Sequence, residues 1–273
     1  MSAISDSVRQ DVRYAIRTFR RTPGFSLLAI ATIAIGVGAN AAIFTIVNAV
    51  LLQPLPFPRA GELFLVAQQN RQTKQSFGDA SPANYLDWRA RNRSFSGMTA
   101  FRDTTFTLAS GDRPERVGGA IVNGNFFGVL GVPAAMGRAL QDADERPGAP
   151  RVAVLSDALW RDRFGARPDI VGQSVRLSDE AHTIVGVMPP AMDYPDRAKL
   201  WVTPHWPVPD DPLAPNVDPS AQRGHGYILV LARLRPGVGV EQAQSEMDAI
   251  MLALGREYPD PDRNLSVAMT SLR

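Results

Sequence analysis

The feature that most constrains this chain is a stretch without charged residues between Arg21 and Arg59. Its apolar centre, Phe25 to Leu52, contains 28 residues. Roughly 20 such residues in a helix are enough to cross the hydrocarbon core of a bilayer. The sequence therefore predicts one transmembrane helix within residues 22–52, followed by a separate domain over residues 53–273.

The residues before this stretch set its expected orientation. Arginines and apolar residues alternate at helical spacing over residues 1–21, which predicts an amphipathic basic arm on the inner membrane surface. The alternative is a surface helix that contacts a cytoplasmic partner. Basic residues that flank a first span stay in the cytoplasm, so residues 53–273 are expected outside it. The topology determinants in this prediction are Arg9, Arg13, Arg17, Arg20 and Arg21.

A cleavable signal peptide is the main alternative to a retained span. A basic arm, an apolar core and the small residues Ala39-Asn40-Ala41 resemble its three regions. The apolar core of a signal peptide ends after roughly 7–15 residues, whereas the apolar residues here continue to Leu52. This continuation favours a retained span.

Small and amide-bearing residues within the span predict contacts with other helices. Ala34, Gly38 and Ala42 recur every fourth residue, and this spacing allows close approach of a second helix. The amides of Asn40 and Asn48 need hydrogen-bond partners within or near the hydrocarbon. The alternative is that Gly and Ala are simply common in membrane helices. We favour a span that packs in a bundle.

Composition excludes several kinds of chemistry. The chain has no cysteine, which rules out thiol nucleophiles, thiolate zinc sites and disulfides. Its two lysines, Lys74 and Lys199, follow Thr and Ala, so the Gly-Lys-Ser/Thr of a P-loop is absent. The formal net charge is +2, and residues 1–21 hold five arginines against two aspartates. This excess favours membrane lipid rather than nucleic acid as the partner.

The remainder of the chain predicts an α+β domain, either a single unit or two smaller subdomains. The predicted strands cover residues 63–69, 106–108, 117–122, 152–155, 174–177, 182–188 and 227–234. The predicted helices cover residues 81–92, 125–131, 157–164 and 240–256. Residues 204–219 hold six prolines and are expected to form a loop or tether.

Three groups of residues are candidates for a chemical site. His182 with Asp179, Glu180 and nearby serines could form a triad, but no Gly-x-Ser-x-Gly motif is present, and a structural histidine is favoured. The acidic residues within 142–145 could hold calcium, but their spacing does not match an EF-hand, so a solvated turn is favoured. The tryptophans are expected in the core rather than against a ligand. The sequence predicts no catalytic residue, cofactor or metal.

An ordered set of motifs spans nearly the whole chain. The segments are residues 11–25 (DVRYAIRTFRRTPGF), 34–44 (AIGVGANAAIF), 47–57 (VNAVLLQPLPF), 81–88 (SPANYLDW), 125–132 (NFFGVLGV), 154–160 (VLSDALW), 164–165 (FG) and 184–190 (IVGVMPP). With these segments the sequence resembles the MacB-like permeases of ABC transporters, in the branch whose ATPase is a separate chain.

The resemblance implies a first transmembrane helix followed by a mixed α/β periplasmic domain of the MacB core type, in the cell inner (plasma) membrane. It implies a separate ABC ATPase subunit, further permease helices, a second permease copy and a periplasmic protein as partners. It carries over no catalytic residue. Members of the family continue into three further membrane helices, so the resemblance also implies that residues 1–273 are the N-terminal part of a longer permease.

The predicted function is a permease subunit, or its N-terminal part, that couples a periplasmic domain to a cytoplasmic ATPase for export or mechanotransmission. One alternative is a singly anchored periplasmic hydrolase that uses His182. The other is a non-transporting remnant that binds a partner through residues 204–219.

Overall fold

The computed structural model describes residues 23–47, 56–109, 114–146 and 148–272. The chain divides into two compact units, Met1–Pro54 and Leu55–Arg273. Each unit is described by itself below. The basic arm of residues 1–21 lies outside the described residues, and so does residue 48.

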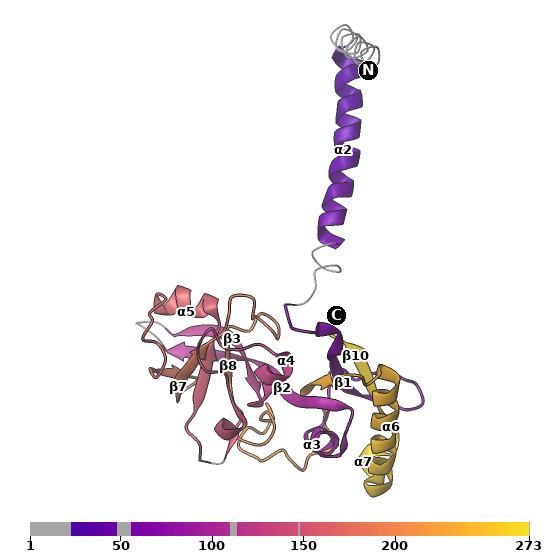
Figure 1. The fold of residues 1–273 in the computed structure, drawn as a ribbon, viewed down its shortest axis with the longest axis vertical. Coiled ribbons are helices and arrows are strands. Elements are labelled where there is room, and N and C mark those ends of the chain that lie inside the picture. The colour runs from indigo at the N-terminus through magenta and orange to yellow at the C-terminus, as the bar shows by residue number, and fades with distance from the viewer. Residues whose placement is uncertain (1–22, 48–55, 110–113, 147, 273) are drawn as a thin grey trace. The chain divides into compact units, whose positions relative to one another are not determined.

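The first unit contains one described helix, α2 (Pro23–Val47), drawn in indigo in Figure 1. It is 25 residues long and carries no acidic or basic residue. Several of its apolar side chains are exposed, for example Leu27 at 74% and Ile35 at 72%. By the combined criteria of length and hydropathy, no helix within the described residues qualifies as a membrane span.

The second unit is a mixed α/β domain built on one sheet of ten strands. Its strands are β1 (Leu63–Asn70), β2 (Phe95–Ala109), β3 (Glu115–Val122), β4 (Met136–Gly137), β5 (Val152–Leu155), β6 (Ser174–Leu177), β7 (Glu180–Val187), β8 (Leu200–Val202), β9 (Leu229–Leu234) and β10 (Leu265–Ser271). Its helices are η2 (Ala60–Glu62), α3 (Pro82–Arg91), α4 (Phe126–Leu130), η3 (Asp142–Glu145), α5 (Asp157–Phe164), α6 (Val240–Glu257) and α7 (Pro259–Asp262).

The strand order is β10-β1-β9-β2-β3-β8-β5-β7-β4, and β6 pairs with both β2 and β7. This double pairing joins β2, β3, β8, β5, β7 and β6 into a closed ring of strands, which we call the ring half. Apolar side chains from all six strands, together with Leu159 of α5, form one buried cluster. Each of these six strands therefore pairs with a neighbouring strand on both of its edges.

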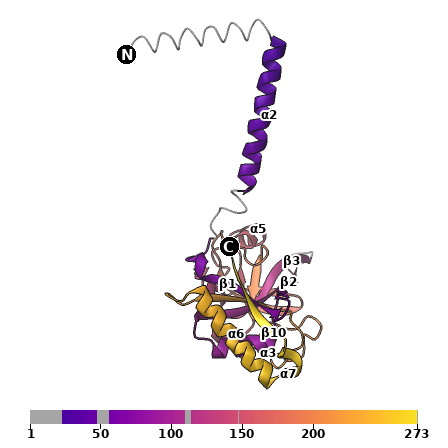
Figure 2. The ribbon, with the colours of Figure 1, turned by 90° about the vertical axis from the view of Figure 1, so that its right-hand side faces the viewer.

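The other part of the sheet is antiparallel and open, and we call it the open half. It comprises β10, β1, β9 and the first part of β2, with α3 and α6 packed on one face. Trp88 of α3 and Met251 of α6 are fully buried there. Figure 2 shows α6 alongside β10.

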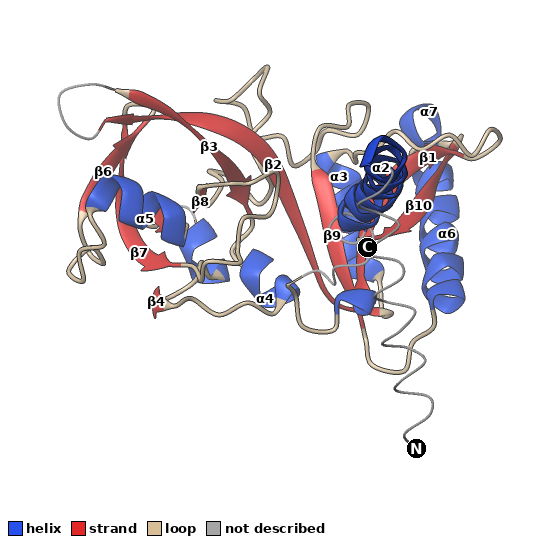
Figure 3. Ribbon diagram, turned by 90° about the horizontal axis from the view of Figure 1, so that it is seen from above, coloured by secondary structure: helices blue, strands red, loops and turns tan. Residues whose placement is uncertain are grey.

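The strand β2 belongs to both halves (Figure 3). Residues 95–101 of this strand pair with β9, and residues 101–109 pair with β3 and β6. Phe101 is the position at which the two pairings meet, opposite Leu229 on one side and Val122 on the other. The ring of Phe101 is fully buried.

Local signals located several elements correctly. Ser156 accepts a hydrogen bond from the amide of Leu159, and Gly165 ends α5 with a φ of 60°. The inward face predicted for α6 is confirmed, since its five members are all buried. They are Ala243, Met247, Ile250, Met251 and Leu254.

Other expectations were incomplete. The strand predicted at residues 106–108 is the end of the 15-residue β2, and the prediction lacks β4, β8 and β10. The proline-rich segment is a loop, as expected, but it is not a free tether. Its middle is packed into the domain, because Val208 is fully buried and the hydroxyl of Tyr227 donates to the carbonyl of Pro209 at 2.9 Å.

Candidate functional site

The proline-rich loop is held to the ring half by His205. The Nδ1 atom of His205 lies 2.7 Å from a carboxylate oxygen of Asp210, and its Nε2 atom lies 3.2 Å from Glu180. Burial raises the pKa of Asp210 to about 6, and the charges of Arg102 and Arg151 offset part of that shift. Both ring nitrogens of His205 therefore have a carboxyl partner, one in the loop and one on β7.

The segment that follows this loop is fixed to the open half by Arg223. Its guanidinium donates to Asp87 at 2.5 Å and to Asn84 at 2.6 Å, and it lies 3.4 Å from Asp262. The same group stacks over the ring of Tyr258 at 3.6 Å. The charge of Arg223 is therefore already matched by two carboxylates.

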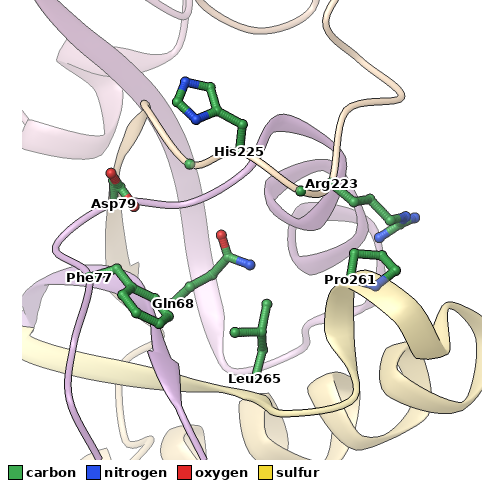
Figure 4. A pocket seen from close by; sticks show the side chains of 9 residues that line it. Gln68, Phe77, Asp79, Arg223, His225, Pro261 and Leu265 are labelled. Carbon is green, nitrogen blue, oxygen red and sulfur yellow. The ribbon is translucent and has the colours of Figure 1, made fainter.

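Beside Arg223 the surface has a hollow of about 500 Å³. It is lined by Gln68, Phe77, Asp79, Arg223, Gly224, His225, Gly226, Pro261 and Leu265. Figure 4 shows Asp79 and Phe77 on one side of this hollow, and Arg223 and Pro261 on the opposite side. Burial raises the pKa of Asp79, and the neighbouring His225 offsets part of that effect.

The two halves of the domain meet at Asn123. Its side-chain oxygen accepts from the hydroxyl of Tyr85 and the amide of Ala100, both at 3.2 Å. Its side-chain nitrogen donates to Glu145 at 3.0 Å and to the carbonyl of Pro207 at 2.9 Å. All four hydrogen bonds of a buried amide are therefore made at one position. Burial raises the pKa of Glu145.

Sequence reasoning did not identify His205, Asp210, Asp79, Arg223 or Asn123. Their partners lie far away in the chain, as in the bond between Arg223 and Asn84, so no short motif marks them. The only local signal was the six prolines of residues 204–219, which indicated a loop without showing its anchors.

The predicted helix-packing residues Ala34, Gly38, Asn40 and Ala42 are all exposed on α2. Their helical spacing places Ala34, Gly38 and Ala42 on one face. Asn48 lies outside the described residues, as do the predicted topology determinants Arg9, Arg13, Arg17, Arg20 and Arg21. The contacts of these residues remain predictions.

His182 is buried at 4% exposure, and its ring contacts the backbone carbonyl of Glu180 at 3.2 Å. Burial lowers the pKa of His182. Within the described residues, no serine hydroxyl or carboxylate forms a hydrogen bond with its ring. The structure therefore does not assemble the triad that the sequence allowed.

The acidic residues within 142–145 are engaged in structural contacts. Asp144 pairs with Arg138 at 2.7 Å, and Glu145 accepts hydrogen bonds from Asn123 and from the amide of Gly124. The described ranges contain no cluster of three His, Cys, Asp or Glu residues suited to a metal. Trp88 and Trp201 are fully buried in the core.

Most of this chain is similar to one known protein family. Residues 26–250 match the model of the MacB-like periplasmic core domain. The chain belongs to this family. The match begins within α2 and ends within α6 of the MacB-like domain.

Solved structures share the fold of this MacB-like domain. A permease-protein domain from Porphyromonas gingivalis matches with a TM-score of 0.57 and 18% identity, covering 80% of this chain and 93% of that one. The periplasmic region of MacB from Actinobacillus actinomycetemcomitans matches with a TM-score of 0.53 and 12% identity, covering 78% and 89%. The extracellular domain of the noncanonic ABC-type transporter YknZ from Gram-positive bacteria matches with a TM-score of 0.50 and 11% identity, covering 76% and 99%. Among curated proteins, no sequence matches the chain.

These similarities support the view that the chain is a component of a transporter. The family is a domain of transporter permeases and is not an enzyme class. The predicted resemblance to MacB-like permeases is confirmed by the family match.

Proposed function

We propose that this chain is a permease subunit of an ABC transporter, or the N-terminal part of one. In this proposal residues 22–52 cross the inner membrane once, residues 1–21 lie in the cytoplasm, and residues 53–273 lie in the periplasm. The observation that carries the proposal is the family match, which continues from residue 26 in the uncharged segment into the α/β domain.

The dimensions and charge of the first unit support this topology. A helix of 25 residues rises roughly 37 Å at about 1.5 Å per residue, which exceeds the roughly 30 Å of a hydrocarbon core. Exposed apolar side chains such as Leu28 and Ile30 suit a lipid environment. The five arginines before α2 favour a cytoplasmic N-terminus.

Reporter fusions test the topology. Alkaline phosphatase, active only outside the cytoplasm, is fused after residue 273, and a fluorescent protein that folds only inside is fused there in a second strain. The proposal expects an active phosphatase and no fluorescence. The opposite pattern would rule it out. Replacing the five arginines by glutamate is the matched control and should lower the phosphatase signal.

The mass of the isolated protein separates a retained span from a signal peptide. A retained span leaves residues 1–21 on the mature chain. Cleavage after Ala41 would remove them together with most of α2, which would contradict the proposal.

We further propose that Ala34, Gly38 and Ala42 form the face of α2 that contacts a second permease helix, with Asn40 and Asn48 supplying hydrogen bonds. Because the chain has no cysteine, Gly38→Cys introduces a single reactive thiol. Oxidation in membranes should cross-link two copies through this position. Ile33→Cys, on the other side of the helix, is the control. Equal cross-linking of both variants would contradict a specific packing face.

Coupling to ATP hydrolysis is assigned to a separate subunit, because this sequence holds no P-loop. The purified chain should hydrolyse no ATP, and a P-loop ATPase should co-purify with it from its native membrane. Hydrolysis by the purified chain alone would contradict this division of labour. The hydrolase alternative has no supporting contact among the described residues, since His182 meets a backbone carbonyl.

A further inference from the structure

We propose that the hollow in Figure 4 binds a small organic cation, an ammonium or guanidinium group, on the carboxylate of Asp79 with the ring of Phe77 beside it. This inference goes beyond the proposed transport function and does not depend on the membrane topology. It rests on the charges, burial and geometry of the residues that line the hollow.

The unmatched charge of the hollow is negative. Arg223 contributes its guanidinium to the wall, but Asp87 and Asp262 already neutralise it, and Tyr258 covers its face. His225 also lines the hollow and lowers the pKa of Asp79 electrostatically. Among the described residues, however, no side chain forms a hydrogen bond or ion pair with the carboxylate of Asp79. A cationic ligand would therefore find a carboxylate without an ion-pair partner.

Partial burial increases the benefit of a cationic ligand. Asp79 is half-buried, and this loss of contact with water disfavours its charged form and raises its pKa. A cation within hydrogen-bond distance replaces that lost solvation. Opposite charges also attract more strongly in a partly buried site than in bulk water.

Phe77 provides a second group suited to a cation. Its ring is 52% exposed and borders the hollow two residues before Asp79. Aromatic faces attract ammonium and guanidinium groups within about 6 Å of the ring centre. An exposed phenylalanine on a surface loop makes little contribution to the core, so its place at this rim fits ligand contact.

Gly226 leaves room for the carboxylate. A Cβ atom at this position would lie 2.4 Å from a carboxylate oxygen of Asp79. Any larger residue would therefore displace either the carboxylate or the backbone at this wall of the hollow.

Calorimetric titration of the full chain in a neutral detergent tests the proposal. Benzylamine supplies an ammonium and a ring, and benzyl alcohol has a similar shape without the charge. Blank micelles correct for partition of both probes. We expect benzylamine to bind at least tenfold more tightly than benzyl alcohol. A smaller difference would overturn the proposal.

Variants assign the binding to this hollow. Asp79→Asn should weaken benzylamine binding at least tenfold, and Phe77→Ala should weaken it about two- to fivefold. Asp169→Asn, which removes an exposed carboxylate paired with Arg167, is the matched control and should change nothing. Unchanged binding by Asp79→Asn would overturn the proposal. If Asp79→Asn does not fold, the Phe77→Ala variant tests the proposal instead. Unchanged benzylamine binding by Phe77→Ala would then overturn it.

Discussion

The open half and the ring half share β2 but complete their sheets differently. In the open half, β10 is the last strand, and α3 and α6 cover one face. In the ring half, β6 pairs with β2 and β7, so the strands enclose their own core, and the one helix packed against it is the short α5 with Leu159, Trp160 and Phe164, within the described residues. The open half therefore depends on helix packing, whereas the ring half depends on close approach between strands.

The strongest test of this comparison is at Phe101, where the two halves join. Phe101→Ala removes a fully buried ring, whose centroid lies 5.5 Å from that of Phe126 and 5.6 Å from that of Tyr194. We expect a loss of about 3–5 kcal/mol in the free energy of unfolding, with both halves affected together. Denaturant unfolding with hydrogen exchange measures this. Phe77→Ala, at an exposed ring, is the control, and loss of exchange protection in one half alone would show that the halves are independent.

A second substitution addresses the open half by itself. Met251→Ala removes a buried side chain of α6 whose sulfur accepts a hydrogen bond from the indole of Trp88 at 3.0 Å. We expect a loss of about 2–5 kcal/mol, with faster amide exchange mainly in the open half. Leu252→Ala, at a neighbouring residue that is 44% exposed, should cost much less. Equal costs would contradict the role assigned to this helix face.

The ring half should instead be sensitive to added volume. At Gly119 of β3 a Cβ atom would lie 2.6 Å from the backbone carbonyl oxygen of Leu200 in β8. Gly119→Ala should therefore destabilise by about 1–3 kcal/mol. Gly118→Ala, on β3 with open space around it, should stay within about 0.5 kcal/mol. The two variants are compared by thermal unfolding, and similar shifts would argue against strand contact as the cause.

The smallest expected effect is a pH dependence in the ring half. Burial lowers the pKa of His182 in the folded state, so the unfolded state binds more protons. The stability linked to His182 is thus present above its ordinary pKa of about 6.5 and is lost as the pH falls below it. His182→Gln should reduce the loss of stability between pH 7.5 and 5.5. His225→Gln, at an exposed ring, is the control, and an identical profile for both variants would contradict this assignment.

Prediction from sequence succeeded where signals were local and failed where pairing was distant. The first part of β2 lacked the alternation of a half-exposed strand, because residues 98–101 are buried consecutively. Met98 and Ala100 face the core beneath α6. Phe101 belongs to a different buried cluster, which includes Phe126 and Phe127 of α4. A strand covered on both faces shows no period of two.

The hollow and the loop anchors were also beyond sequence reasoning. Asp79 and Arg223 are far apart in the chain but line the same hollow. His205 could be seen as one histidine among prolines, but its contact with Glu180 required the folded hairpin of β6 and β7. The core position expected for the tryptophans is confirmed for Trp88 and Trp201, whereas Trp160 and Trp206 are only partly buried.

The sequence by itself determined the uncharged helical segment, the ends of α5, the buried face of α6 and the resemblance to MacB-like permeases. These features depend on residue type and spacing within a few turns of chain. Only the tertiary structure decided that β10 pairs with β1, that β6 closes the ring, and that Asn123 joins the halves. Strand pairing and buried hydrogen bonds unite residues that are distant in the chain, and no local pattern specifies those partners.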